Sequence, residues 1–131
     1  MAKVSFTGED AAFLLEWSED GSGDYLVSIG AEAEGFRGHS DGHVVGADFR
    51  RFIEELERLD QLRSGKAQIS SAAQGLFEVT IHSIDSAGHM GVSGVLRYLR
   101  TGPERPYQVI EFFFEFDPSQ LPEAVSDAHA V

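Results

Sequence analysis

The sharpest cluster of chemically capable side chains consists of His39, Asp41 and His43, which place two imidazoles and a carboxylate within five residues. Imidazole and carboxylate are suitable ligands for zinc and other divalent ions. Residues 36–45 are rich in glycine and short polar side chains, so we predict a loop here, and no fourth ligand accompanies the three. We therefore expect solvated turn residues with no metal or cofactor. A small metal-binding protein or enzyme centred on this loop is the alternative.

A second group consists of carboxylates at alternating positions of predicted strands. Paired carboxylates can act as general acid and base when their surroundings separate their pKa values. Glu111 and Glu115, however, are four residues apart on one predicted strand, which places them roughly 13 Å apart. That separation is too long for a glycosidase pair acting alone. We predict a partner-binding acidic surface, and no catalytic residue, from Glu32, Glu34, Glu78, Glu111 and Glu115.

Further candidates give weaker signals. His82 and His89 flank a predicted hairpin turn at 85–88, where they could face each other and titrate near neutral pH. Phe113 lies between Glu111 and Glu115; we expect it in the core, with an exposed anchor for a partner as the alternative. The serines lack a nucleophile elbow, and no glycine pattern suits a phosphate site. These patterns favour a protein that is not an enzyme.

Charge and composition narrow the class of partner. The 131 residues contain 10 Lys and Arg against 22 Asp and Glu, a formal charge of −12. Nucleic acids and anionic membranes attract basic proteins, so we expect neither as a partner and predict a basic protein instead. The chain has no cysteine, no apolar run long enough to span a membrane and no recognisable signal peptide. We expect a cytoplasmic protein with a single domain over residues 1–131.

These side chains must be positioned by one helix and several strands. Apolar residues at spacings of three and four predict an amphipathic helix over 46–62, with Asp48 as its cap or first-turn acid. Period-two alternation predicts strands at 3–7, 12–17, 25–34, 66–70, 76–82, 89–98 and 107–116. Asp117 before Pro118 predicts the start of a short C-terminal helix. The fold class is therefore α+β, a largely antiparallel sheet of six to seven strands on one long helix, without internal repeat.

Four stretches together resemble the small bacterial WapI-type immunity proteins. They are Gly35-Phe36-Arg37-Gly38, residues 48–59, residues 88–94, and Phe112 to Leu121. The resemblance implies a cytoplasmic, non-enzymatic protein that binds and neutralises a toxin domain. The resemblance does not identify which residues of this chain bind the toxin. An acidic inhibitor would gain association rate and selectivity toward a basic toxin. A self-associating module, such as a homodimer joined through a sheet edge or Phe113, is a further alternative.

Overall fold

The computed structural model describes residues 2–72, 75–98 and 108–129. Within them, the chain order of the elements is β1 (Ala2–Gly8), β2 (Ala11–Glu19), β3 (Tyr25–Ala33), β4 (Phe36–Val44), α1 (Gly46–Leu62), β5 (Lys66–Ser70), β6 (Phe77–Ser83), β7 (Met90–Tyr98), β8 (Gln108–Phe116), the 3-10 turn η1 (Pro118–Gln120) and α2 (Leu121–His129). Tyr107, the predicted first residue of the last strand, lies outside the described residues.

The strands form two antiparallel sheets. In the described part of the chain, sheet A has the order β1-β2-β3-β4 and sheet B the order β5-β6-β7-β8. The α+β class and the antiparallel pairing are confirmed, but the prediction of one sheet with six to seven strands is wrong. Alternation along a strand shows which residues share a face, but not which strand lies next to it. Four strands followed by a helix occur twice, a repeat of topology that the sequence does not display.

Strand β4 occupies residues for which the sequence predicts a loop, so that prediction is wrong. Its inward positions include Gly38, Ser40 and Gly42 instead of large apolar residues. A Cβ on Gly38 would lie 2.6 Å from Cδ1 of Ile110 on β8, so the glycine allows sheet B to approach. The Ser40 hydroxyl donates to the Leu76 carbonyl at 3.2 Å. Close packing of the two sheets thus requires small residues at the inward positions of β4. Because these positions lack large apolar side chains, the sequence does not show the apolar–polar alternation that predicts a strand.

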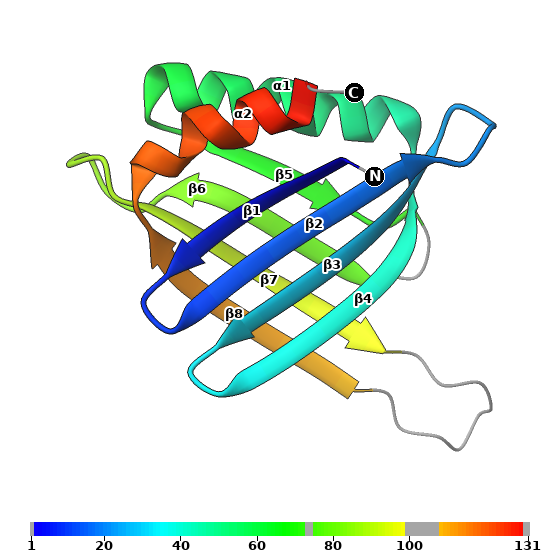
Figure 1. The fold of residues 1–131 in the computed structure, drawn as a ribbon, viewed down its shortest axis with the longest axis horizontal. Helices are drawn as coiled ribbons and strands as arrows, with labels where there is room; N and C mark the ends of the chain where they lie inside the picture. Colours follow the sequence, from blue (N-terminus) through cyan, green and yellow to red (C-terminus); the bar gives the residue numbers. More distant parts are fainter. Residues whose placement is uncertain (1, 73–74, 99–107, 130–131) are drawn as a thin grey trace.

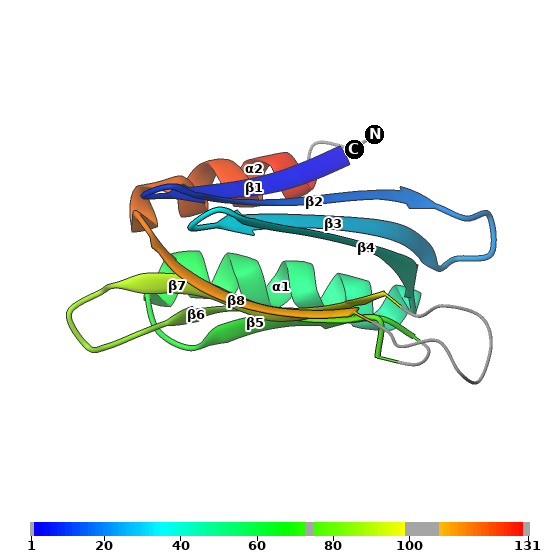
Figure 2. The ribbon, with the colours of Figure 1, turned by 90° about the horizontal axis from the view of Figure 1, so that it is seen from below.

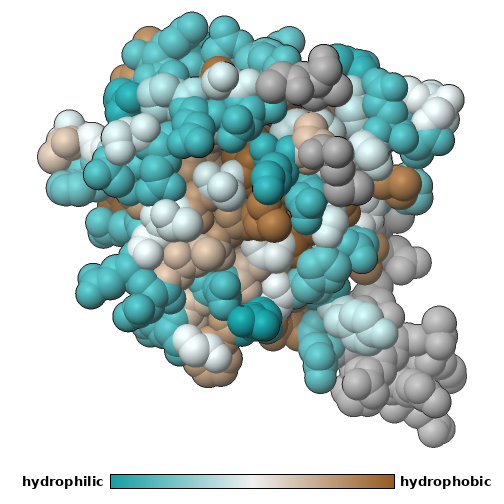
Figure 3. Space-filling view, viewed as in Figure 1, coloured by the Kyte–Doolittle hydropathy of each residue, from teal (hydrophilic) through white to brown (hydrophobic). Residues whose placement is uncertain are grey.

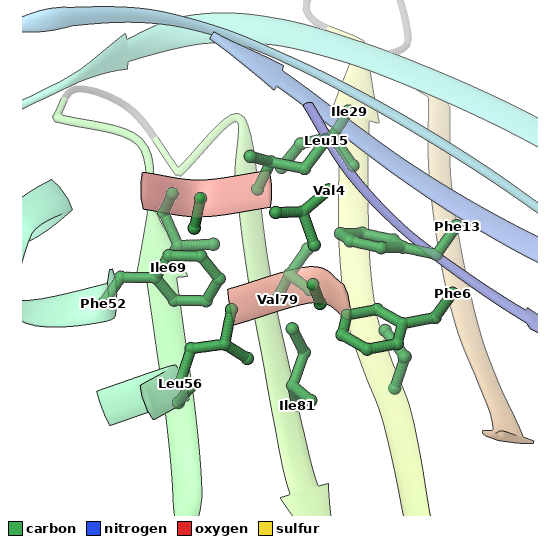
Figure 4. Close-up of a cluster of buried hydrophobic side chains, with 14 of the residues drawn as sticks. Val4, Phe6, Phe13, Leu15, Ile29, Phe52, Leu56, Ile69, Val79 and Ile81 are labelled. Carbon is green, nitrogen blue, oxygen red and sulfur yellow. The ribbon is translucent and has the colours of Figure 1, made fainter. Parts of the chain in front are cut away.

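The two sheets lie face to face with their strands crossing (Figure 1). Helix α1 runs along one side, at a level between the two layers (Figure 2). It packs beside β5, while α2 packs beside β1 and against α1. The inner faces meet in one apolar cluster shown in Figure 4, where Phe6 and Phe13 of sheet A approach Val79 and Ile81 of sheet B. The helices thus cover the outer edges of β1 and β5 and leave β8 as an edge strand.

Helix α1 has the predicted extent and buries Phe49, Phe52, Leu56 and Leu59. At the start of the helix, the expectation of Asp48 as a first-turn acid is confirmed, and the alternative of Asp48 as the cap is wrong. Val45 occupies the N-cap without a capping side chain, and Asp48 lies in the first turn, 2.8 Å from Arg51. The Gly46 N–H donates to the carboxylate of Asp24, at the end of the β2–β3 connection, at 2.8 Å. A residue 22 positions away therefore caps the helix.

The C-terminal segment follows the prediction more closely. Asp117 caps η1 by accepting the Ser119 N–H at 2.9 Å, with Pro118 at the first position. This hydrogen bond lowers the pKa of Asp117 below its ordinary value. Leu121, Ala124 and Ala128 of α2 are buried. Among the described residues, no helix combines the length and apolar character that crossing a membrane requires.

Candidate partner-binding surface

Three of the five predicted glutamates share the outer face of sheet B. Glu78 on β6 and Glu111 on β8 both lie opposite Val95 of β7, so they occupy one row across the sheet. Two strand spacings separate them by roughly 10 Å. Glu115 points to the same side, four residues further along β8. All three side chains are exposed. The structure therefore brings Glu78, Glu111 and Glu115 onto one surface.

Glu34 joins this surface across a groove. It forms the two-residue β3–β4 turn with Gly35, with φ angles of 50° and 87°, and its N–H donates to the Asp10 carbonyl at 3.2 Å. A groove of about 380 Å³ separates this hairpin from β8. The hairpin side is lined by Ala31, Ala33, Glu34 and Phe36, and the β8 side by residues 109–113. Glu34 and Glu111 thus line the same groove from different sheets.

Glu32 is separate from the other four. It lies on the outer face of sheet A, where its carboxylate forms an ion pair with Arg37 at 3.3 Å. It does not line the groove. The alternation of apolar and polar residues in 25–34 correctly predicts that Glu32 is exposed. It does not show whether Glu32 shares a surface with the glutamates of other strands, because that depends on the sheet to which each strand belongs.

Phe113 is exposed, so the expectation that it would be a core residue is wrong. Its side chain lies on the outer face of sheet B between Glu111 and Glu115, with 51% of its surface exposed. The ring lies over Gly91, where a Cβ would be 2.8 Å from ring atom Cε1. The His82 ring is 6.1 Å away, centroid to centroid. The glycine therefore makes room for an aromatic ring that lies along the sheet.

Phe36 and Val109 are groove residues that the sequence analysis did not select. Their exposed fractions are 75% and 45%. Phe36 follows the Glu34-Gly35 turn and is the one large apolar residue between positions 34 and 43. A single aromatic residue beside a turn is the feature of the sequence that indicates Phe36 as a candidate. Because residues 36–45 were predicted to form a loop, Phe36 was not assigned to an exposed strand position.

The outer face of sheet A differs from that of sheet B. Figure 3 shows apolar side chains near the middle of this side of the molecule, surrounded by hydrophilic ones. Leu14 and Leu26 are exposed apolar residues of this face. A hollow of about 250 Å³ lies beside Leu14 and Gly30, where the glycine leaves space between its neighbours. Its charged lining residues, Glu32 and Arg37, already form an ion pair with each other.

The His39, Asp41 and His43 cluster also lies on sheet A, in strand β4 and not in a loop. His39 Nε2 lies 3.2 Å from an Asp41 oxygen and 2.8 Å from the Ser28 hydroxyl. His43 lies 3.8 Å from a carboxylate oxygen of Asp20, one residue after the end of β2. The two histidines therefore have different partners. Within residues 2–72, 75–98 and 108–129, no group of three or more His, Cys, Asp or Glu side chains could hold a metal ion.

His82 and His89 do not face each other. His82 lies opposite Gly91, and its Nε2 is 3.2 Å from the Ser93 hydroxyl. His89 Nδ1 lies 2.7 Å from Asp85. The hydrogen bond with Asp85 raises the pKa of His89, with a smaller contribution from the charge of Glu115, and it lowers the pKa of Asp85. The β6–β7 hairpin thus presents a charge pair near Glu115.

A larger hollow of about 870 Å³ lies at another part of the molecule, where α1 approaches β2 and β3. Its aromatic wall includes Tyr25 and Phe49, stacked at 4.3 Å, and Trp17, whose ring is 5.2 Å from that of Phe49. Arg50 and Glu54 of α1 line its polar side. His129 of α2 also lines the hollow, and its Nε2 lies 3.2 Å from a carboxylate oxygen of Glu57 on α1. No group of three or more His, Cys, Asp or Glu side chains that could hold a metal ion accompanies these residues in the described part of the chain.

Comparison with solved structures finds a similar chain in the work titled "Crystal structures of trypanosoma bruciei MRP1/MRP2". The TM-score is 0.46 and the sequence identity 16%, covering 96% of this chain and 81% of that one. No curated protein matches the sequence. The model of a protein family matches residues 3–131, nearly the whole chain, as the resemblance in the sequence predicted. This protein therefore belongs to the immunity protein WapI-like family.

Proposed function

We propose that this protein is an immunity protein that neutralises a basic toxin domain by binding it, without catalysing a reaction. Membership of the WapI-like family supports the immunity role. The observation that supports the binding surface is the outer face of sheet B, where an exposed Phe113 lies between Glu111 and Glu115. We name this face, together with the groove beside it, the β8 surface; its residues are Glu34, Phe36, Glu78, Val109, Glu111, Phe113 and Glu115.

The β8 surface has the composition of a binding site. Interfaces commonly centre on a few aromatic anchors surrounded by polar residues, and the anchors contribute most of the binding energy. Phe113 fits the first role, and Glu78, Glu111 and Glu115 fit the second. No ion pair among the described residues involves these three glutamates or Glu34. Their charges are therefore available to a partner.

Overall charge supports a basic partner. A chain with a formal charge of −12 attracts a positively charged protein over distance, which raises the association rate at low salt. A toxin that cleaves nucleic acid needs a basic surface, and an acidic protein that covers this surface blocks access of the substrate. This mechanism requires no cofactor and no catalytic group on the immunity protein.

The test first searches the genes beside that for this chain for an encoded toxin domain, and then uses that domain. Co-expression of the wild-type chain is expected to protect cells from that toxin, and the purified proteins are expected to form a 1:1 complex. Phe113→Ala should weaken binding by about 2 kcal/mol, roughly thirtyfold. Glu111→Gln and Glu115→Gln should mainly slow association and reduce its salt dependence.

Glu32→Gln is the matched control, because Glu32 is also an exposed strand glutamate but lies on the other sheet and pairs with Arg37. Its binding should remain within about twofold of wild type. A folded wild-type chain that neither protects cells nor binds the toxin would contradict the proposed function. Light scattering of the free chain tests the alternative of a self-associating module, such as a homodimer.

A further inference from the structure

The groove between the β3–β4 hairpin and β8 has apolar walls and acidic sides. It runs along five consecutive residues of β8, 109–113. Among the described residues, β8 pairs with β7 along one edge and has no strand partner along the edge that lines the groove. Phe36, Val109 and Phe113 expose apolar surface along it. We propose that this groove binds an arginine side chain of the partner, with its guanidinium between Glu34 and Glu111. This inference rests on the proposed function and specifies what the β8 surface recognises.

The size and chemistry of the groove suit this occupant. Its volume of about 380 Å³ lies near the lower end of small-ligand sites, which are roughly 300–1,000 Å³. An arginine side chain has an apolar stem that can pack on Phe36 and Val109. Its planar guanidinium stacks on aromatic rings and forms paired hydrogen bonds with carboxylates. Lysine has a compact, strongly hydrated charge and gains less from the aromatic walls.

The charge distribution around the hairpin points to a cation from outside the described residues. Glu32, two residues before Glu34, already has Arg37 as its partner at 3.3 Å. Glu34 and Glu111, which line the groove, have no ion pair in the described part of the chain. Of the two glutamates in this hairpin, Glu32 on sheet A therefore pairs with a cation. Glu34, which lines the groove opposite β8, has no cationic partner among the described residues. Charge complementarity favours a cationic group beside Glu34.

The backbone at Glu34 provides a variant that separates binding from folding. Glu34 has φ of 50°, a left-handed conformation in which asparagine is favoured and glutamate is not. In a two-residue hairpin with Gly35 following, Asn-Gly is the preferred pair. Glu34→Asn should therefore keep or raise the melting temperature while it removes the carboxylate from the groove.

The experiment titrates the full chain, labelled with ¹⁵N, with N-acetyl-arginine methylamide and follows the amide shifts by NMR. We expect saturable changes at residues 31–36 and 109–113, with a dissociation constant of order 1–10 mM for a single side chain. The citrulline analogue has the same shape without the charge and should bind about tenfold more weakly, because it lacks charge-assisted hydrogen bonds. The lysine analogue should also bind more weakly than arginine.

Variants locate the site within the groove. Glu34→Asn and Glu111→Gln should each weaken arginine binding about tenfold, and Phe36→Ala should weaken arginine and citrulline alike. Glu32→Gln should leave arginine binding unchanged. Equal binding of arginine and citrulline, shifts confined to other surfaces, or a lysine analogue that binds as tightly as arginine would overturn the proposal. So would binding that appears only after Arg100 and Arg105 are replaced by glutamine, because the occupant would then belong to this chain.

The outcomes separate this inference from the proposed function. A chain that binds the toxin but shows no arginine binding in the groove would refute the inference alone. A chain that binds arginine in the groove but neither binds the toxin nor protects cells would refute the proposed function alone.

Discussion

The cap of helix α1 provides the most direct test of the packing. Asp24 accepts the N–H of Gly46 at 2.8 Å, and Gly46 is buried, so water has limited access to that N–H. A Cβ on Gly46 would lie 2.1 Å from the Gly23 carbonyl oxygen, which shows how closely the helix start rests on the β2–β3 connection. Asp24→Ala removes the acceptor and its negative charge from the positive end of the helix dipole.

The expected cost follows from these contacts. Loss of a capping side chain costs about 1 kcal/mol, and loss of a favourable charge at the helix start adds about 0.5 kcal/mol. We therefore expect Asp24→Ala to lower the free energy of unfolding by about 1.5 kcal/mol. With an unfolding entropy of about 2.1 cal/mol/K per residue, the melting temperature of a chain of this length should fall by about 5 °C.

Urea unfolding followed by fluorescence is a suitable assay, because the one tryptophan, Trp17, lies 5.2 Å from Phe49 of α1. Asp24→Asn retains an acceptor oxygen but loses the charge, so it should cost only about 0.5 kcal/mol. Asp48→Ala removes only an exposed first-turn charge paired with Arg51 and should cost about 0.5 kcal/mol. The explanation is refuted if Asp24→Ala is no more destabilising than Asp48→Ala, or if Asp24→Asn costs as much as Asp24→Ala.

Three other predictions test the sheets and the hairpin. Gly38→Ala should destabilise the fold by about 1–2 kcal/mol in urea unfolding, because its Cβ would contact Ile110, and Ile110→Val should restore part of that loss. Phe52→Ala should cost about 3–5 kcal/mol in the same assay, because the ring is fully buried. NMR titration should give His89 a pKa above 6.5, which Asp85→Asn lowers. Since folding raises this pKa, the contact stabilises the fold below about pH 6.5, and that stabilisation is lost as pH rises through the folded-state pKa.

Local patterns in the sequence were sufficient for the features that depend on near neighbours. The spacing of apolar residues over 46–62 predicted α1 because one face of a helix must be buried. Alternation in 76–82 predicted which residues of β6 point inward, and Phe77, Val79 and Ile81 are buried. Asp117 followed by Pro118 indicated the start of the C-terminal helical segment. The four stretches between residues 35 and 121 that resemble the family predicted the family whose model matches residues 3–131.

Features that depend on contacts between distant residues required the tertiary structure. Alternation shows the face of each glutamate but not the neighbouring strand, so only the division into two sheets separated Glu32 from Glu78, Glu111 and Glu115. Strand β4 has small inward residues because sheet B packs against them, and that contact is not visible in the local sequence. The Asp24 cap and the groove that joins Glu34 to Glu111 likewise exist only after folding. Residue types determined which elements form, and packing of the two sheets decided which side chains share a surface.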